Sequence, residues 1–320
     1  MAERPNARGM APSGKESSGA FASAQEDRHH ACLDPATPQT LSPAYRLGYA
    51  DLDFMMRDEL RPARLQLEYL KPEIMQRDRG ITSTVVVFGS ARIPDPEKAA
   101  SLLEEAERAA AAAPGDPGAA QRLKTARALA DKVRYYEEAR RLGQLLSTPA
   151  EETAPLCANG QPRHRHKLVV VTGGGPGIME AANRGASDVG AETVGLNIVL
   201  PFEQMPNAYV TPHLCFDFHY FALRKMHFMM RAKALVVFPG GFGTLDELFE
   251  VLCLIQTRKI KPIPVLLFGR EYWQKIINFP ALVEEGVIEP HELDIFSYAE
   301  SAEEAWGLLE PALNGSASRE

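Results

Sequence analysis

The sequence is poor in features that mark several classes of protein. It has four cysteines in 320 residues, at Cys32, Cys157, Cys215 and Cys253, and no two of them form a C-x-x-C pair. This spacing argues against a disulfide framework or a zinc site and indicates reduced thiols. No apolar run approaches the roughly 18 residues of a membrane span. The N-terminal stretch also lacks the apolar segment of a signal peptide. We therefore expect a cytoplasmic protein with no membrane partner.

The chain also has no excess of positive charge. The chain has 35 Lys and Arg against 42 Asp and Glu, which gives a net charge of −7. Such a balance does not favour nucleic acid as a partner. Hydrophobic residues make up 45% and charged residues 24% of the sequence, as in ordinary globular proteins. The length allows one large domain or two.

The N-terminal part divides into two predicted segments. Residues 1–42 have few aliphatic side chains and are predicted to be a disordered tail. Gly9, Gly14 and Lys15 match the start of a P-loop, but Glu16 stands where Ser or Thr must bind magnesium. We therefore predict no P-loop here. Residues 43–80 carry apolar residues at helical spacing and are predicted to be a helical extension that packs on the core or pairs across a dimer.

Residues 81–310 alternate between apolar runs and helical patterns. The predicted strands are 85–88, 168–171, 193–196, 234–238 and 263–268. The predicted helices are 131–146, 177–189, 219–232, 244–257 and 271–285. Continuous apolar strands that alternate with helices predict an α/β fold of the Rossmann-like type, a doubly wound parallel sheet with helices on both faces.

An Ala-rich segment, 97–130, departs from this alternation. Two Pro-Gly-type breaks, Pro114-Gly115 and Pro117-Gly118, interrupt it near its centre. We predict a helical hairpin, inserted between the first strand and its main helix, with an exposed tip at 113–119.

The most informative motif is Pro-Gly-Gly-Phe-Gly-Thr-Leu-Asp-Glu, from Pro239 to Glu247. It joins a buried strand to a helix N-terminus, whose unpaired N–H groups and dipole favour an anion, most often phosphate. Glu247 would bring an acid or base to the rest of the ligand. A simpler interpretation is a tight turn capped by Thr244, with Glu247 as its capping-box partner. The predicted substrate-binding residues of this loop are Gly240, Gly241, Phe242, Gly243 and Thr244.

A second glycine loop, 173–180, follows the strand 168–171, and Gly89 and Ser90 follow the first strand. Parallel strands place these three glycine-bearing ends along one edge of the sheet. Neither loop contains G-x-G-x-x-G, because Ile178 and Asp246 occupy the third glycine position. This disfavours NAD and suggests a nucleoside monophosphate or sugar phosphate. One loop would take the phosphate and the other the ribose. The further predicted substrate-binding residues are Gly89, Ser90, Gly174, Gly175 and Met179.

The segment 216–225 ends in Arg224 and Lys225, which could bind a phosphate or a ribose hydroxyl. Its aromatic residues could stack on a base or fill the core, and the sequence leaves both open. The methionines and phenylalanine at 226–230 are expected in the core. The cluster 164–167 contains two histidines but no nearby acidic ligand, so we predict a solvated loop and no metal site.

Arg224-Lys225, followed by Pro-Gly-Gly-x-Gly-Thr-x-x-Glu, resembles the LOG (Lonely guy) family of phosphoribohydrolases, which were long labelled lysine decarboxylases. Gly89-Ser90 and the 173–180 loop match the family in the same order. The resemblance implies hydrolysis of the N-glycosidic bond of a nucleoside 5′-monophosphate, AMP or a cytokinin riboside monophosphate. It implies Arg224 and Glu247 as catalytic residues, Glu203 as a ligand contact, and a two-fold dimer. Lys225, next to Arg224, is predicted from its charge to contact the ligand as well. We expect no cofactor, and a homodimer or a higher even oligomer. The extension and the insertion are more like the longer bacterial members, for which AMP is the expected substrate.

The residue chemistry agrees with this activity. Glycosidic hydrolysis passes through an oxocarbenium-like state, which a carboxylate such as Glu247 can stabilise while it orients water. No residue is singled out as a Schiff-base lysine, so a decarboxylase is not supported. A non-catalytic nucleotide-binding module on the same fold remains the alternative, because fold and phosphate loops alone do not prove turnover.

Overall fold

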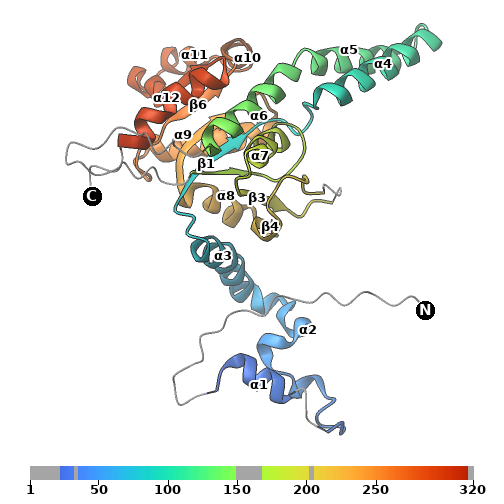
Figure 1. The fold of residues 1–320 in the computed structure, drawn as a ribbon, viewed down its shortest axis with the longest axis vertical. Coiled ribbons are helices and arrows are strands. Elements are labelled where there is room, and N and C mark those ends of the chain that lie inside the picture. The colour runs from blue at the N-terminus through green and yellow to red at the C-terminus, as the bar shows by residue number, and fades with distance from the viewer. Residues whose placement is uncertain (1–21, 32–34, 149–167, 202–204, 316–320) are drawn as a thin grey trace. The chain divides into compact units, whose positions relative to one another are not determined.

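The computed structural model describes residues 22–31, 35–148, 168–201 and 205–315 (Figure 1). The chain forms two compact units, Met1–Arg64 and Leu65–Glu320. The division falls inside the predicted 43–80 extension, within helix α3 (Arg61–Asp78). Most of α3, from Leu65 onward, therefore belongs to the larger unit. Within that part, the Glu68 side chain accepts the backbone N–H groups of His219 and Tyr220, just before the helix that carries Arg224.

The smaller unit consists of short helices. They are α1 (Ala24–Ala31), η1 (Pro43–Tyr45), η2 (Gly48–Ala50), α2 (Leu52–Met55) and η3 (Asp58–Leu60). Helix α1 lies in the segment predicted to be disordered, so that prediction is wrong over these residues. The reason is a capping box that the sequence analysis missed: the Ser23 N–H donates to Glu26 Oε2, and the Glu26 N–H donates to Ser23 Oγ. The helix buries no residue.

The larger unit is built on a seven-stranded sheet, with all its strand pairs parallel. Its order is β4-β3-β2-β1-β5-β6-β7. The strands are β1 (Ser83–Phe88), β2 (Leu168–Thr172), β3 (Thr193–Ile198), β4 (Cys215–Phe218), β5 (Ala232–Val237), β6 (Val265–Phe268) and β7 (Phe296–Ala299). The sequence analysis missed β4 and β7. Both are short strands at the sheet edges and both are partly exposed, so neither forms a continuous apolar run.

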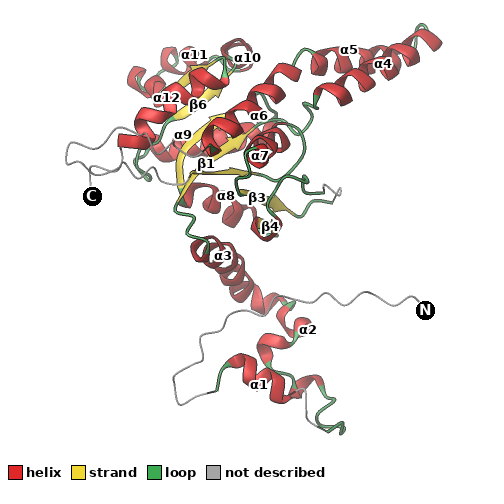
Figure 2. Cartoon of the chain, viewed as in Figure 1, coloured by secondary structure: helices red, strands yellow, loops and turns green. Residues whose placement is uncertain are grey.

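Alternate residues of each strand point to opposite faces of the sheet, and helices cover both faces (Figure 2). Val85 and Val87 pack with α6 (Val133–Ser147), α7 (Ile178–Asp188) and α12 (Ala302–Gly315). On the other face, Val86 and Phe88 pack with α8 (Phe221–Met230), α9 (Phe242–Gln256), α10 (Arg270–Ile276) and α11 (Phe279–Glu284). The predicted Rossmann-like doubly wound fold is confirmed.

The segment predicted as a helical hairpin forms α4 (Pro96–Ala112) and α5 (Pro117–Ala130), which extend away from the sheet between β1 and α6 (Figure 2). Residues 113–118 at its tip are exposed, whereas Ala119 is buried. The predicted helix 271–285 is two helices, α10 and α11. The Asn278 side chain accepts the Ala281 N–H and starts α11, which carries proline near its start.

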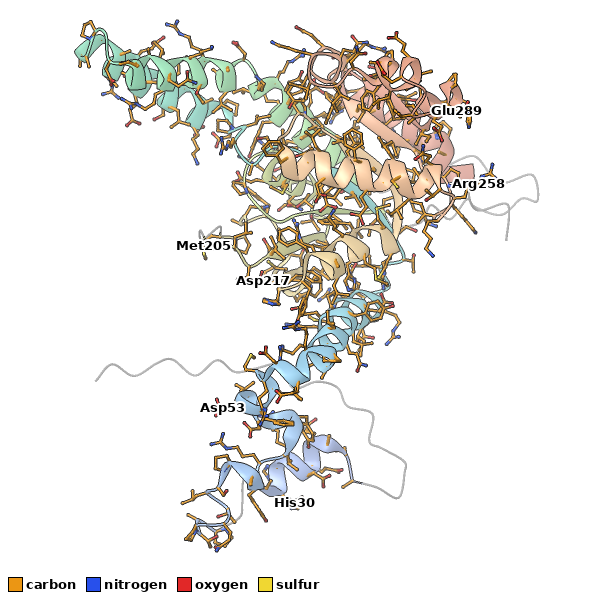
Figure 3. All side chains as sticks on the ribbon, turned by 180° about the vertical axis from the view of Figure 1, so that it is seen from behind. His30, Asp53, Met205, Asp217, Arg258 and Glu289 are labelled. Atoms are coloured by element: carbon orange, nitrogen blue, oxygen red, sulfur yellow. The ribbon has the colours of Figure 1, made fainter. Side chains whose placement is uncertain are left out.

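The remaining helical turns are η4 (Pro212–Leu214) and η5 (Pro290–Ile295). Met205 is exposed, and Arg258 takes a φ of 56° just after the end of α9 (Figure 3). None of the helices in the described ranges combines the length and the apolar character that crossing a lipid bilayer requires.

Candidate active site

The site lies where the order of the strands reverses. The chain builds β1 to β4 outward in one direction and then crosses to the other side of β1 to begin β5. In such sheets the crevice at the carboxyl ends of the two strands that flank this switch point holds the ligand. A cavity of about 650 Å³ opens there, lined by the ends of β1 and β5 and by residues of α7, α8, α9 and α10.

Most of the residues predicted for the site meet in this cavity. They are Gly89, Ser90, Met179, Arg224, Gly240, Gly241, Phe242, Gly243, Thr244 and Glu247. The glycine-bearing strand ends at 89, 173 and 240 share one edge of the sheet, as expected from β2, β1 and β5 being neighbours. Glu203 lies outside the described residues.

Gly174, Gly175 and Lys225 do not line the cavity. Asn207 Nδ2 donates to the carbonyls of Gly174 and Gly175 at 3.1 and 3.0 Å, which fixes the shape of that loop. A side chain on Gly174 would lie 2.4 Å from Asn197 Oδ1, so glycine is required by close packing. Lys225 Nζ instead pairs with Asp246 and Glu250 of α9, at 2.8 and 2.9 Å, and ties α8 to α9.

The 239–247 loop leads into a helix N-terminus of the kind that binds anions. Helix α9 begins at Phe242, with Gly241 as its N-cap and no side-chain cap. Within the described part of the chain, the N–H groups of Phe242, Gly243 and Thr244 have no acceptor. These donors and the positive end of the helix dipole face the cavity. The Tyr272 hydroxyl donates to the Gly240 carbonyl at 2.7 Å and holds the loop from α10.

This geometry overturns the simpler interpretation of the loop. Thr244 is the third residue of α9 and not its cap, and Glu247 lies in the second turn. The helix begins earlier than predicted because Gly241 is extended, with φ −95° and ψ −151°, immediately before it. Gly240 has no space for a side chain, since a Cβ there would lie 2.1 Å from Thr244 Oγ1. The loop therefore presents backbone to the cavity.

Arg224 and Glu247 form a buried pair at the base of the cavity. Arg224 Nη1 lies 3.9 Å from Glu247 Oε1, and the two side chains are 13% and 8% exposed. Arg224 Nε donates to the Leu196 carbonyl at 2.8 Å, and the guanidinium lies 5.1 Å from the Phe228 ring centre. Gly173 makes room for this arrangement, because a Cβ there would lie 2.8 Å from Arg224 Nη2.

Burial decides the electrostatics of this pair. It raises the pKa of Glu247 to about 7, although Arg224 and Lys225 act in the opposite direction. Burial also lowers the pKa of Arg224, while Glu247 acts to raise it. Arginine stays charged even so. Glu247 therefore exchanges a proton near neutral pH, which is the condition for an efficient acid or base.

Several cavity residues were missed by the sequence analysis. Arg92 is exposed, forms no ion pair with any described residue, and donates its N–H to Ser90 Oγ. Its place two residues after the Gly89-Ser90 strand end was a usable signal. Tyr272 and Ile276 come from the helix after β6, so only the strand order reveals them.

The structure distinguishes core residues from cavity residues among the aromatic side chains of 216–225, for which the sequence allowed either role. Phe216 and Phe218 are 3% and 1% exposed and belong to the core. Phe221 is 51% exposed and lines the cavity, where it could meet a base. Phe228 is buried as expected, but Met226 is 48% exposed, so the core prediction is wrong for Met226. It is wrong because Met226 lies on a face of α8 turned away from the sheet.

Two other features of the described residues do not compete with this site. A second cavity, of about 430 Å³, lies in the α4–α5 hairpin and is lined by four alanines, four charged residues, Gly115 and Leu123. It has no glycine loop at a strand end and no buried carboxylate. No group of three or more His, Cys, Asp and Glu in the described ranges could hold a metal ion.

The fold and the site define a Rossmann-like α/β protein. Its cavity combines a helix N-terminus suited to an anion with a buried arginine–glutamate pair. Residues 179–309 match a family described as possible lysine decarboxylase. The chain is 31% identical, over 146 residues, to a cytokinin riboside 5′-monophosphate phosphoribohydrolase of Arabidopsis thaliana, covering 44% of this chain and 67% of that protein. A probable enzyme of the same name from Oryza sativa subsp. japonica is 29% identical over 159 residues, covering 49% and 68%. The chain belongs to the LOG family.

Among solved structures, the chain is similar to a Moco carrier protein of Chlamydomonas reinhardtii, with a TM-score of 0.41 and 16% identity over 73% of this chain and 99% of that one. It is also similar to a molybdenum cofactor binding protein of Rippkaea orientalis, with a TM-score of 0.39, 16% identity, and 72% and 96% of the two chains covered. Similarity at this level carries no information on ligands. The decarboxylase description finds no support in the cavity, whose described lining contains no lysine.

Proposed function

We propose that the protein hydrolyses the N-glycosidic bond of a nucleoside 5′-monophosphate to free base and ribose 5-phosphate, with AMP as the preferred substrate. The observation that carries this proposal is the Arg224–Glu247 pair, buried in the same cavity as the N-terminus of α9. A helix N-terminus suits the 5′-phosphate, and a carboxylate beside it suits the cation that develops at the sugar. These two groups also suit the phosphoribohydrolase activity named for its relatives.

The 5′-phosphate is bound at the N-terminus of α9. The unpaired N–H groups of Phe242, Gly243 and Thr244 bind the phosphate, and the exposed Arg92 guanidinium adds a positive charge at the same cavity. Arg224 holds a phosphate oxygen or a ribose hydroxyl. Its fixed position, set by the Leu196 carbonyl, lets it do so without reorganisation.

Glu247 acts on the anomeric carbon. As the bond from C1′ to the base nitrogen breaks, the carboxylate stabilises the positive charge on the ribose and takes a proton from the attacking water. The water oxygen bonds to C1′, the electron pair of the broken bond stays on the base nitrogen, and the proton that Glu247 took from the water passes to the leaving base, which regenerates the carboxylate. A pKa of about 7 leaves a large share of the carboxyl ionised at neutral pH for this role.

AMP is favoured over cytokinin riboside monophosphates because the chain departs from the plant proteins outside the shared core. The α4–α5 hairpin and the helical extension lie outside the 179–309 match. They are more like the longer bacterial members of the family, for which AMP is expected.

Incubation with a panel of nucleoside 5′-monophosphates tests the activity. The products to measure are free base, by chromatography, and ribose 5-phosphate, by a coupled assay. We expect AMP to be cleaved and adenosine to be cleaved poorly, because remote phosphate binding lowers the barrier. Comparable kcat/KM for AMP and adenosine would contradict this map of the site. Tight binding of AMP without turnover would instead support a non-catalytic binding module.

We also propose a cytoplasmic homodimer with α8 beside the interface. Four large apolar side chains on α8 and α9 are exposed in the single chain, namely Phe221, Met226, Phe242 and Phe249. Exposed groups of this kind often mark interfaces. Light scattering and activity measured on one dilution series test the proposal. We expect activity to fall as the dimer dissociates, and a fully active monomer would contradict the coupling.

A further inference from the structure

The N-terminus of α8 is held by a side chain from another helix. Tyr220, the N-cap of α8, makes no side-chain cap of its own. Instead, both carboxylate oxygens of Glu68 in α3 accept backbone N–H groups here. Oε1 accepts the His219 N–H at 3.0 Å, and Oε2 accepts the Tyr220 N–H at 3.1 Å. A negative charge at this end of a helix is also favoured by the helix dipole.

The C-terminal end of α8 is held by the same helix. Arg231, the C-cap of α8, pairs with Glu73 of α3 through Nη2 and Oε2 at 2.8 Å. Arg231 Nε also donates to the Ile81 carbonyl at 3.0 Å. Between these two ends, the Tyr69 ring lies 5.7 Å from the ring of the buried His227. Side chains of α3 therefore contact α8 at both of its ends and at His227.

Helix α8 is also the element that carries Arg224, one turn after the Glu68 contact. Any shift of the helix start moves the Arg224 guanidinium relative to Glu247, which is on α9. We propose that Glu68 is a positioning residue, which fixes the start of α8 so that Arg224 lies at the right distance from Glu247. The expected effect on catalysis rests on the proposed function. The expected effect on the position of Arg224 relative to Glu247 is independent of that function.

Helix α3 lies outside the residues that match the family, 179–309. The contact therefore gives the extension a task in the active site that the family motifs themselves do not supply. A purely structural role for Glu68 would alter stability and leave the Arg224–Glu247 geometry unchanged. A positioning role must change a property of Glu247 itself.

The test compares Glu68→Ala and Glu68→Gln with the control Asp78→Ala. Asp78 is on the same helix, is exposed, and makes no hydrogen bond or ion pair with any described residue. The glutamine variant keeps one acceptor oxygen and serves if the alanine variant does not fold. We expect kcat for AMP to fall roughly 10- to 100-fold in Glu68→Ala, with a smaller fall in Glu68→Gln, because small displacements of a catalytic group have effects of this size. Asp78→Ala should match the wild type.

The pKa of Glu247, followed by NMR of ¹³C-labelled glutamate carboxyls and assigned with Glu247→Gln, gives a readout that does not need turnover. Arg224 lowers this pKa, so a displaced Arg224 should let it rise above the wild-type value. The rising limb of the pH–rate profile should then move to higher pH. A lower kcat with an unchanged Glu247 pKa, or an unchanged kcat, overturns the inference. Absence of turnover in the wild type defeats the proposed function alone, because the titration still tests the positioning.

Discussion

Replacing Glu247 by glutamine should lower activity and, above neutral pH, raise stability. The carboxyl is 8% exposed, and burial raises its pKa from 4.5 to about 7. The rise of the pKa from 4.5 to about 7 corresponds to a free-energy difference of about 3 kcal/mol between the folded and unfolded protein above both values, at about 1.4 kcal/mol for each tenfold change in proton affinity. The folded protein keeps a proton that the unfolded chain releases between pH 4.5 and about 7, so this group makes stability fall as pH rises through that window.

Glutamine imitates the protonated carboxyl and never ionises, so it removes this pH-dependent penalty. We expect Glu247→Gln and the wild type to differ little by this effect below pH 4.5. At pH 8.5 the free energy of unfolding of the variant, relative to the wild type, should be about 3 kcal/mol higher than the same difference at pH 4.5. Its rate with AMP should fall at least ~10²-fold, the scale of one acid–base or electrostatic group.

Urea titrations at pH 4.5, 6.5 and 8.5 provide the assay. The two tryptophans, Trp273 and Trp306, both lie in the larger unit and report its unfolding. Glu137→Gln is the matched control, because Glu137 is exposed and makes no hydrogen bond or ion pair with any described residue. A stability difference between Glu247→Gln and the wild type that does not change with pH would refute the electrostatic reasoning. Near-wild-type turnover by the variant would refute the catalytic role.

Three further predictions address the surroundings of this pair. Gly173→Ala should displace Arg224, since the new Cβ would lie 2.8 Å from its Nη2, and should reduce kcat/KM for AMP about 10²-fold; unchanged kinetics would show that Arg224 can move without consequence. Tyr272→Phe removes the hydrogen bond to the Gly240 carbonyl and should weaken phosphate binding. We expect the KM for AMP to rise more than the KM for adenosine. An equal rise in both KM values would argue against a role of Tyr272 at the phosphate loop. Limited proteolysis should cut the exposed residues 113–118 before the sheet, and protection of that tip, seen by mass spectrometry, would indicate a packed tip.

The sequence was sufficient for five of the seven strands and for most of the cavity. Strands buried on both faces are continuous apolar runs, and five of these runs were visible. The glycine loops were visible because close backbone approach leaves no alternative residue, as at Gly240. Edge strands β4 and β7 were missed because a short, half-exposed strand has no such signature.

The sequence could not decide which side chains near the motifs line the cavity. Lys225 was predicted to contact the ligand because it adjoins Arg224, yet the helical rotation between neighbours turns it toward Asp246 and Glu250. Tyr272 enters the cavity because β6 lies next to β5, which is a fact of strand order.

The sequence by itself determined the class of fold, the anion-type loop and the identity of the arginine and glutamate, since each depends on local periodicity or on a short motif. The tertiary structure alone decided their distance of 3.9 Å, the raised pKa of Glu247 and the contact of Glu68 with the start of α8. These three properties depend on burial and on contacts between elements far apart in the chain. Glu68 and His219, which are 151 positions apart, meet because the fold packs α3 against α8.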